Sequence, residues 1–130
     1  MYILLVDDSS VMRKMAKIKL TYRHKLYIVE AENGKEALDL VKREKPGFII
    51  TDVNMPVMDG FEFITEVRKI YDKLELPIIA YTSDPSNIEK CIELGCNQAI
   101  LKPIDIMALK DAIHSFAQKD PKYEAIKHKA

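Results

Sequence analysis

Signals for zinc, membrane and nucleic-acid binding are weak in this sequence of 130 residues. Its two cysteines, Cys91 and Cys96, lack CxxC spacing and have no histidines arranged around them, so a zinc site is not expected. We expect both to be reduced, packed thiols of a cytoplasmic protein. No apolar run approaches the roughly 18 residues of a membrane span, so membrane insertion is not expected. The 20 basic and 20 acidic residues balance, which gives no reason to expect direct binding to nucleic acid.

The chain does contain a regular alternation of short apolar runs and amphipathic segments. The first run, Tyr2–Val6, has no basic lead and ends on two aspartates, so we interpret it as a strand and not as a signal peptide. Strands are predicted at Tyr2–Val6, Leu26–Val29, Phe48–Thr51, Ile78–Tyr81 and Gln98–Leu101. Helices are predicted after a cap at Ser9 or Ser10, and over Lys35–Glu44, Phe61–Tyr71, Ser86–Leu94 and Ile104–Gln118.

Five strands that alternate with five helices through short connections predict a parallel sheet with helices on both faces. The fold class is therefore α/β, a doubly wound five-stranded parallel sheet in the order 2-1-3-4-5, which is the flavodoxin-like (βα)5 arrangement. Residues 1–119 are predicted to form one domain, and residues 120–130 a mostly polar tail. The inward face of the first helix is predicted to consist of Val11, Met12, Met15, Ile18 and Leu20. The same spacing predicts inward residues in two later helices, Ile70 near the end of Phe61–Tyr71, and Ile106, Leu109, Ile113 and Phe116 in the last.

Polar side chains follow four of the five predicted strands. They are Asp7 and Asp8, Asp52, Thr82 with Ser83, and Lys102. The carboxyl ends of parallel strands meet at one edge of the sheet, where open α/β folds bind their ligands, so these groups are predicted to converge. Any one of them is a weak signal, because a single acidic residue at a strand end is more often a helix cap than a ligand. Their joint occurrence at four strand ends is what indicates a functional site.

The three aspartates predict a metal site. Crowded carboxylates repel one another unless their pKa values rise or a cation intervenes. Oxygen ligands without cysteine or histidine suit Mg²⁺. We expect Asp8 and Asp52 as direct ligands and Asp7 as a more distant one that acts through water. The backbone carbonyl of Asn54 is a further candidate ligand.

Asp52 itself is the predicted nucleophile, because it ends a strand that is apolar throughout and an ionised aspartate can accept a phosphoryl group. Lys102 would offer a fixed positive charge near it, and Thr82 a hydroxyl. Together with Mg²⁺ these groups would neutralise the oxygens of an incoming phosphoryl group, which is the main requirement of phosphoryl transfer.

On these residues the sequence resembles the receiver domain of CheY-like, two-component response regulators, over about residues 2–118. The resemblance is carried by Leu5–Ser9, Thr82–Ser83, Leu101–Pro103 and above all Asp52–Gly60. The last segment has the highly specific pattern Asp-x-x-Met-Pro-x-x-Asp-Gly.

The resemblance implies that Asp52 is phosphorylated by a histidine kinase or phosphotransfer protein, from a phosphohistidine. Asp7, Asp8 and the Asn54 carbonyl would hold Mg²⁺. The protein would be a signalling switch that catalyses its own phosphorylation and dephosphorylation, and not an enzyme in the ordinary sense. No output domain is expected in so short a chain, so we expect a stand-alone receiver that acts by docking to another protein.

The resemblance also implies that Thr82 and Lys102 bind the phosphoryl oxygens and that the bond between Lys102 and Pro103 is cis. One position departs from the family, which usually has Tyr or Phe three residues before the lysine. Here that residue is Ala99, so the usual coupling of threonine to an inward-swinging aromatic cannot operate. Tyr81 should face the opposite side of its strand from Thr82. We expect a different rearrangement to carry the signal.

Two other functions compete with a signalling switch. A small Mg²⁺-dependent phosphatase with an aspartyl nucleophile would place that nucleophile after the first strand in an Asp-x-Asp pattern, whereas Asp7 and Asp8 are adjacent. A flavodoxin-like cofactor binder would need a phosphate loop rich in Ser, Thr and Gly at the same place. Treatment with Mg²⁺ and a small phosphodonor would distinguish the three.

Overall fold

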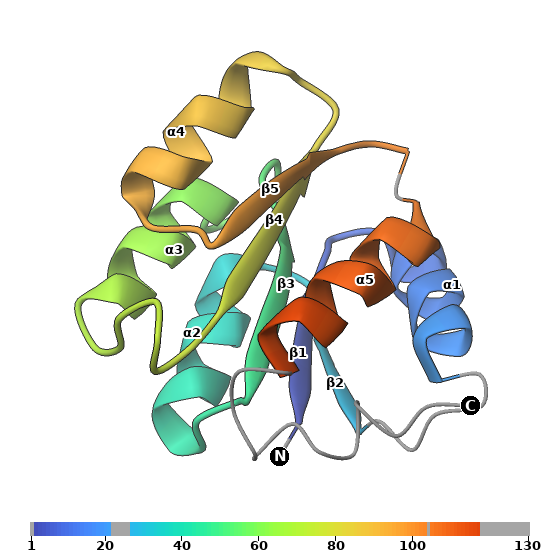
Figure 1. Ribbon diagram of the computed structural model, residues 1–130. Coiled ribbons are helices and arrows are strands. Elements are labelled where there is room, and N and C mark those ends of the chain that lie inside the picture. Colours follow the sequence, from blue (N-terminus) through green and yellow to red (C-terminus); the bar gives the residue numbers. More distant parts are fainter. Residues whose placement is uncertain (1, 22–26, 104, 118–130) are drawn as a thin grey trace.

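The structure of the protein is a computed structural model that describes residues 2–21, 27–103 and 105–117. Its strands form one parallel sheet in the order β2-β1-β3-β4-β5 (Figure 1). The strands are β1 (Ile3–Val6), β2 (Ile28–Ala31), β3 (Phe48–Asp52), β4 (Ile78–Thr82) and β5 (Gln98–Leu101). This arrangement confirms the predicted fold class and strand order. The proposed tail over residues 120–130 lies outside the described residues.

Five helices cover the two faces of the sheet. They are α1 (Ser10–Thr21), α2 (Gly34–Arg43), α3 (Gly60–Arg68), α4 (Ser86–Leu94) and α5 (Ile106–Ala117). Helices α1 and α5 lie on one face, and α2, α3 and α4 on the other (Figure 1). No helix within the described ranges is both long and apolar enough to span a bilayer.

Two hydrophobic clusters, one on each face, hold the layers together. Buried side chains of α2, α3 and α4 meet one face of the sheet. Buried side chains of α1 and α5, among them Leu20 and Leu109, meet the other. Every residue of β1, β3 and β4 is buried, which explains their nearly uninterrupted apolar sequences. Cys91 and Cys96 are free and buried, as expected.

The second strand begins two residues later than predicted. It runs over Ile28–Ala31 and not over Leu26–Val29, and Leu26 lies outside the described residues. Ile28 pairs with Ile3, and Ala31 with Val6. The predicted strand ended at Val29, two residues too early, because Glu30 interrupts the apolar pattern. An edge strand tolerates this residue, whose carboxylate is paired with Arg13 and Lys17 of α1.

The predicted inner face of α1 is wrong at three of its five residues. Val11, Met15 and Ile18 are 65%, 47% and 61% exposed. Of the other predicted residues, Leu20 is buried and Met12 is half-buried, and Ala16, which was not predicted, is buried as well. The helix carries apolar residues on two faces, so its periodicity does not decide which face meets the sheet. The face that packs is the one with Ala16 and Leu20, which belong to the same buried cluster as Ile3 and Leu5 of β1.

Smaller corrections concern α3 and α5. Helix α3 ends at Arg68, before the predicted Tyr71, and Ile70, expected to face inward, is 43% exposed because it follows the helix. In α5 the predicted inward residues Leu109 and Ile113 are buried. The side chains of Ile106 and Phe116, also predicted to face inward, lie outside the described part of the structure.

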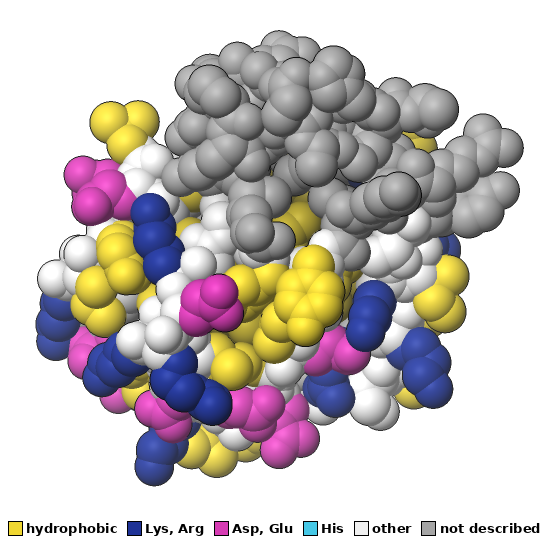
Figure 2. All heavy atoms as spheres, turned by 90° about the horizontal axis from the view of Figure 1, so that it is seen from below, with side chains coloured by type: hydrophobic (Ala, Val, Ile, Leu, Met, Phe, Trp, Pro, Cys, Tyr) yellow, Lys and Arg dark blue, Asp and Glu magenta, His cyan; other side chains and the backbone are white. Residues whose placement is uncertain are grey.

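Arg68 joins several segments at the amino ends of β4 and β5. Its guanidinium donates hydrogen bonds to the carbonyl oxygens of Tyr71, Asp72, Leu76 and Gly95 and to the side chain of Asn97. Figure 2 shows this end of the molecule, where hydrophobic side chains are surrounded by charges of both signs. The opposite end, at the carboxyl ends of the strands, holds the aspartates.

Candidate functional site

Three aspartates converge at the carboxyl edge of the sheet, as the sequence predicts. Asp7 and Asp8 follow β1, and Asp52 ends the neighbouring strand β3. One carboxylate oxygen from each lies within 4.8 Å of the other two. Asp7 and Asp52 are buried, whereas Asp8 is exposed. We call these three residues the acidic cluster.

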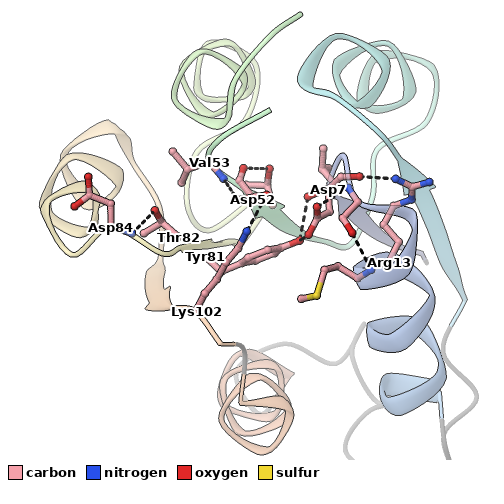
Figure 3. Close-up of polar contacts among 12 residues, drawn as sticks. Asp7, Arg13, Asp52, Val53, Tyr81, Thr82, Asp84 and Lys102 are labelled. Carbon is pink, nitrogen blue, oxygen red and sulfur yellow. Dashed lines mark hydrogen bonds and ion pairs between the residues drawn. The ribbon is translucent and has the colours of Figure 1, made fainter. Parts of the chain in front are cut away.

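Both oxygens of the Asp52 carboxylate have a hydrogen-bond donor. Its Oδ1 accepts from the backbone N–H of Val53 at 2.7 Å, and its Oδ2 lies 3.1 Å from the Nζ of Lys102 (Figure 3). Burial raises the pKa of Asp52, the hydrogen bond from Lys102 opposes that shift, and the charge of Asp7 adds to it. The two hydrogen bonds thus hold the Asp52 carboxylate in one orientation, in a buried environment with little access to solvent.

Lys102 reaches Asp52 from the end of β5. Its backbone N–H donates to the Thr82 carbonyl at 2.8 Å, which extends the pairing of β4 with β5 by one residue. The Lys102–Pro103 peptide bond is cis, as the family resemblance implies. The ammonium group also lies 5.3 Å from the centre of the Tyr81 ring, close enough for a cation–π contact.

Thr82 is buried at the same edge, but its hydroxyl points toward α4. The Oγ1 accepts hydrogen bonds from the backbone of Asp84 at 3.2 Å and from the Asn87 side chain at 3.0 Å. Within the described ranges this hydroxyl makes no hydrogen bond with Asp52 or Lys102. The strand end is therefore where it was predicted, whereas the hydroxyl is turned to the first turn of α4.

Asn54 lies two residues beyond Asp52, in the loop before α3, and is exposed. Its carbonyl as a metal ligand stays a prediction. The same loop is shaped by Gly60, whose N–H donates to the Val53 carbonyl at 2.7 Å. A Cβ on Gly60 would lie only 2.7 Å from the Cα of Val53, so glycine is required where the loop folds back onto the end of β3.

Sequence reasoning missed several residues at the site. The Tyr81 hydroxyl donates to Oδ2 of Asp7 at 2.6 Å, across the intervening strand β3. Arg13 of α1 donates to the backbone carbonyl of Asp7 at 2.6 Å. Alternation along β4 correctly predicts that Tyr81 and Thr82 face opposite sides. It does not predict that a side chain as long as tyrosine reaches a carboxylate two strands away, nor that Asn87 reaches back to Thr82.

The chemistry of the acidic cluster fits a hard divalent cation. It has three carboxylates in close contact, and the cationic side chain that touches it within the described residues is Lys102. Arg13 adds positive charge nearby, but it binds a backbone oxygen. The negative charge of the site therefore exceeds its positive charge. Its potential ligand atoms are all oxygens, and oxygen is the ligand type that Mg²⁺ prefers.

Comparison with known families agrees with this geometry. The family described as "Response regulator receiver domain" matches residues 3–114. The chain belongs to this family. Receivers of this CheY-like kind are signalling switches, and the acidic cluster fits a phosphoryl-acceptor site.

Several relatives resemble this receiver over nearly its full length. A chemotaxis protein CheY homolog of Campylobacter jejuni is 39% identical over 116 residues, which cover 87% of this chain and 89% of that protein. An uncharacterized 14.6 kDa protein of Leptolyngbya boryana is 35% identical, with 93% of each chain covered. The structure of the chemotaxis response regulator CheY4 of Vibrio cholerae matches this receiver with a TM-score of 0.79 at 31% identity, covering 88% of this chain and 97% of that one.

The receiver departs from the usual family pattern at Ala99. This residue is half-buried on β5 and packs against the cluster beneath α2, α3 and α4. Tyr81 belongs to the cluster on the other face, so it does not replace the missing aromatic there.

Proposed function

We propose that this receiver accepts a phosphoryl group on Asp52 from a phosphohistidine of a histidine kinase or phosphotransfer protein in the cytoplasm. The single observation that carries the proposal is the placement of Asp52, which is buried, oriented by Val53 and Lys102, and within 4.8 Å of two further carboxylates. A carboxylate that only capped a helix would need none of these neighbours.

In the proposed step, an oxygen of Asp52 forms a bond to phosphorus while the phosphorus–nitrogen bond of the donor breaks. The leaving imidazole keeps the electron pair and takes up a proton. Asp7, Asp8, Asp52 and the Asn54 carbonyl would hold Mg²⁺, which when bound neutralises negative charge on the transferring group. Lys102, already 3.1 Å from Asp52, would neutralise another oxygen of that group.

Thr82 would complete the site once a phosphoryl group is present. Its oxygen already accepts two hydrogen bonds, so its own proton is the part that a phosphoryl oxygen would engage. We further propose that output occurs by docking to another protein, through the surface formed by α4, β5 and α5. The contact of Thr82 with Asn87 supports this path, because it joins the site to α4 without an aromatic residue at position 99.

The test is incubation with Mg²⁺ and acetyl phosphate, followed by intact-mass measurement. The parent protein should gain one acyl phosphate, labile to hydroxylamine, and Asp52→Asn should gain none. Asp39→Asn, which alters an exposed aspartate of α2, is the matched control and should behave as the parent does.

Other outcomes would contradict the proposal. Modification that persists in Asp52→Asn would place the acceptor elsewhere. Multiple turnover of small phosphate esters without a stable phosphoprotein would indicate a phosphatase, and copurification of a flavin would indicate a cofactor binder.

A further inference from the structure

Tyr81 is buried to 98% and is in contact with both the negative and the positive part of the site. Its hydroxyl donates to Oδ2 of Asp7 at 2.6 Å, and the Val6 carbonyl lies 3.3 Å away as a second, weaker acceptor. The face of its ring lies under the ammonium of Lys102 (Figure 3). A distance of 2.6 Å is that of a charge-assisted O–H···O⁻ hydrogen bond, which is roughly twice as strong as one between neutral groups.

The carboxylate of Asp7 has a donor on each oxygen. Oδ1 accepts from the backbone N–H of Ser9 at 2.9 Å, and Oδ2 accepts from Tyr81. These two bonds fix the plane of the carboxylate and leave a second lone pair on each oxygen for other partners. The donor on Oδ1 belongs to the backbone, so Tyr81 supplies the one side-chain hydrogen bond to this carboxylate among the described residues.

The tyrosine is the donor in this contact. The two oxygens that its hydroxyl faces, Oδ2 of Asp7 and the Val6 carbonyl, are both acceptors, so the phenolic proton makes the bond. The shorter of the two contacts directs that proton at Asp7. Burial and the negative charges of Asp7, Asp52 and Asp8 raise the pKa of the hydroxyl, which agrees with this role.

We propose that Tyr81 is a positioning residue for Mg²⁺, whose hydroxyl holds the Asp7 carboxylate in the orientation that the acidic cluster needs to bind the cation. The inference rests on the proposed function in taking the acidic cluster as a Mg²⁺ site. Partners that hydrogen-bond to metal ligands typically contribute 10- to 100-fold to metal affinity. Removing the Tyr81 hydroxyl is therefore expected to weaken Mg²⁺ binding by about 10-fold or more.

The experiment compares Tyr81→Phe with the parent by calorimetric titration with Mg²⁺ alone. Tyr2→Phe is the matched control, because Tyr2 is also buried and its hydroxyl donates to the Glu44 carbonyl, away from the acidic cluster. Both variants lose one buried hydroxyl and are expected to lose some thermal stability. Only Tyr81→Phe should lose Mg²⁺ affinity.

A double-mutant cycle tests whether the effect passes through Asp7. In an Asp7→Asn background, Tyr81→Phe should no longer change Mg²⁺ affinity by the same factor, because the charge-assisted bond is already gone. An equal loss in both backgrounds would overturn the inference. So would unchanged Mg²⁺ affinity in Tyr81→Phe, or an equal loss in Tyr2→Phe.

A measurement on the unaltered protein covers the case in which Tyr81→Phe does not fold. With ¹³Cζ-labelled tyrosine, the NMR signal of Tyr81 should shift during Mg²⁺ titration with the midpoint found by calorimetry, whereas that of Tyr2 should not. A chemical shift of Tyr81 that does not change when Mg²⁺ is added would overturn the inference. If the parent neither binds Mg²⁺ nor forms an acyl phosphate, the proposed function itself fails; if it does both, only the role of Tyr81 is at stake.

Discussion

Gly60 lies directly against the backbone of Asp52, with no room for a side chain between them. A Cβ at position 60 would collide with the carbonyl oxygen of Asp52 and lie 2.7 Å from the Cα of Val53. The first residue of α3 thus sets the position of Asp52, the proposed phosphoryl acceptor, which explains why Asp-Gly follows at this distance.

Gly60→Ala is therefore expected to displace the end of β3. The overpacking should lower the free energy of unfolding by roughly 1–3 kcal/mol and slow phosphorylation of Asp52. Urea denaturation and acetyl phosphate labelling measure the two effects. Glu62→Ala, an exposed change in the same helical turn, should leave both nearly unaltered. Labelling of Gly60→Ala at the rate of the parent would contradict the proposed contact.

Val57 is in a backbone conformation that its side chain disfavours. Its φ is 70°, in the left-handed region, and it is 75% exposed, so packing does not compensate the strain. Val57→Asn should raise the free energy of unfolding by about 1 kcal/mol, since asparagine adopts this conformation more readily. Val11→Asn, at an exposed valine of α1, should bring no such gain when both are measured by chemical denaturation.

The raised pKa of Asp52 predicts how stability depends on pH. The ordinary pKa of this group is 3.8 and burial raises it, so the folded protein binds more protons than the unfolded chain between the two values. Stability without Mg²⁺ should therefore fall as pH rises through that interval. Asp52→Asn should melt at a higher temperature than the parent at pH 7, and the difference should shrink toward pH 4.

Two controls belong with that prediction. Asp39→Asn should melt as the parent does, and Mg²⁺ should stabilise the parent more than Asp52→Asn at pH 7. A parent that is more stable than Asp52→Asn at neutral pH without Mg²⁺ would show that the pairing with Lys102 outweighs the burial of the carboxylate.

Arg68 is expected to contribute strongly to stability. Lysine cannot reproduce the five hydrogen bonds through which the guanidinium connects α3, the segment before β4 and the α4–β5 turn. Arg68→Lys should lower the free energy of unfolding by about 3 kcal/mol. Arg43→Lys, in the exposed last turn of α2, should change it by less than about 0.5 kcal/mol. Equal urea midpoints for the two variants would refute this role.

The sequence predicted those features that follow from alternation and topology. Because β1, β3 and β4 are buried on both faces, their apolar runs are unambiguous. A parallel sheet then places Asp7, Asp52 and Lys102 at one edge without any knowledge of side-chain packing. The acidic cluster was predictable for this reason.

The sequence did not predict features that depend on which of two apolar helix faces packs, or on how far a single side chain reaches. Helix α1 offers two apolar faces, and only packing shows that Ala16 and not Met15 is inside. The Tyr81 contact with Asp7 passes over a whole strand, and the rotation of Thr82 toward Asn87 is a matter of one side-chain torsion. Neither of these two side-chain contacts produces a periodic pattern in the sequence.

The anchoring of Arg68 has a consequence for the response of the molecule to acid. Among the described residues, the hydrogen-bond partners of its guanidinium are carbonyl and amide oxygens, which do not take up protons in the range where carboxylates do. The other end of the molecule holds Asp52, which takes up a proton more readily in the folded protein than in the unfolded chain. As the medium becomes acidic, the charge of the candidate site should therefore change first, while the pole braced by the arginine keeps its hydrogen bonds.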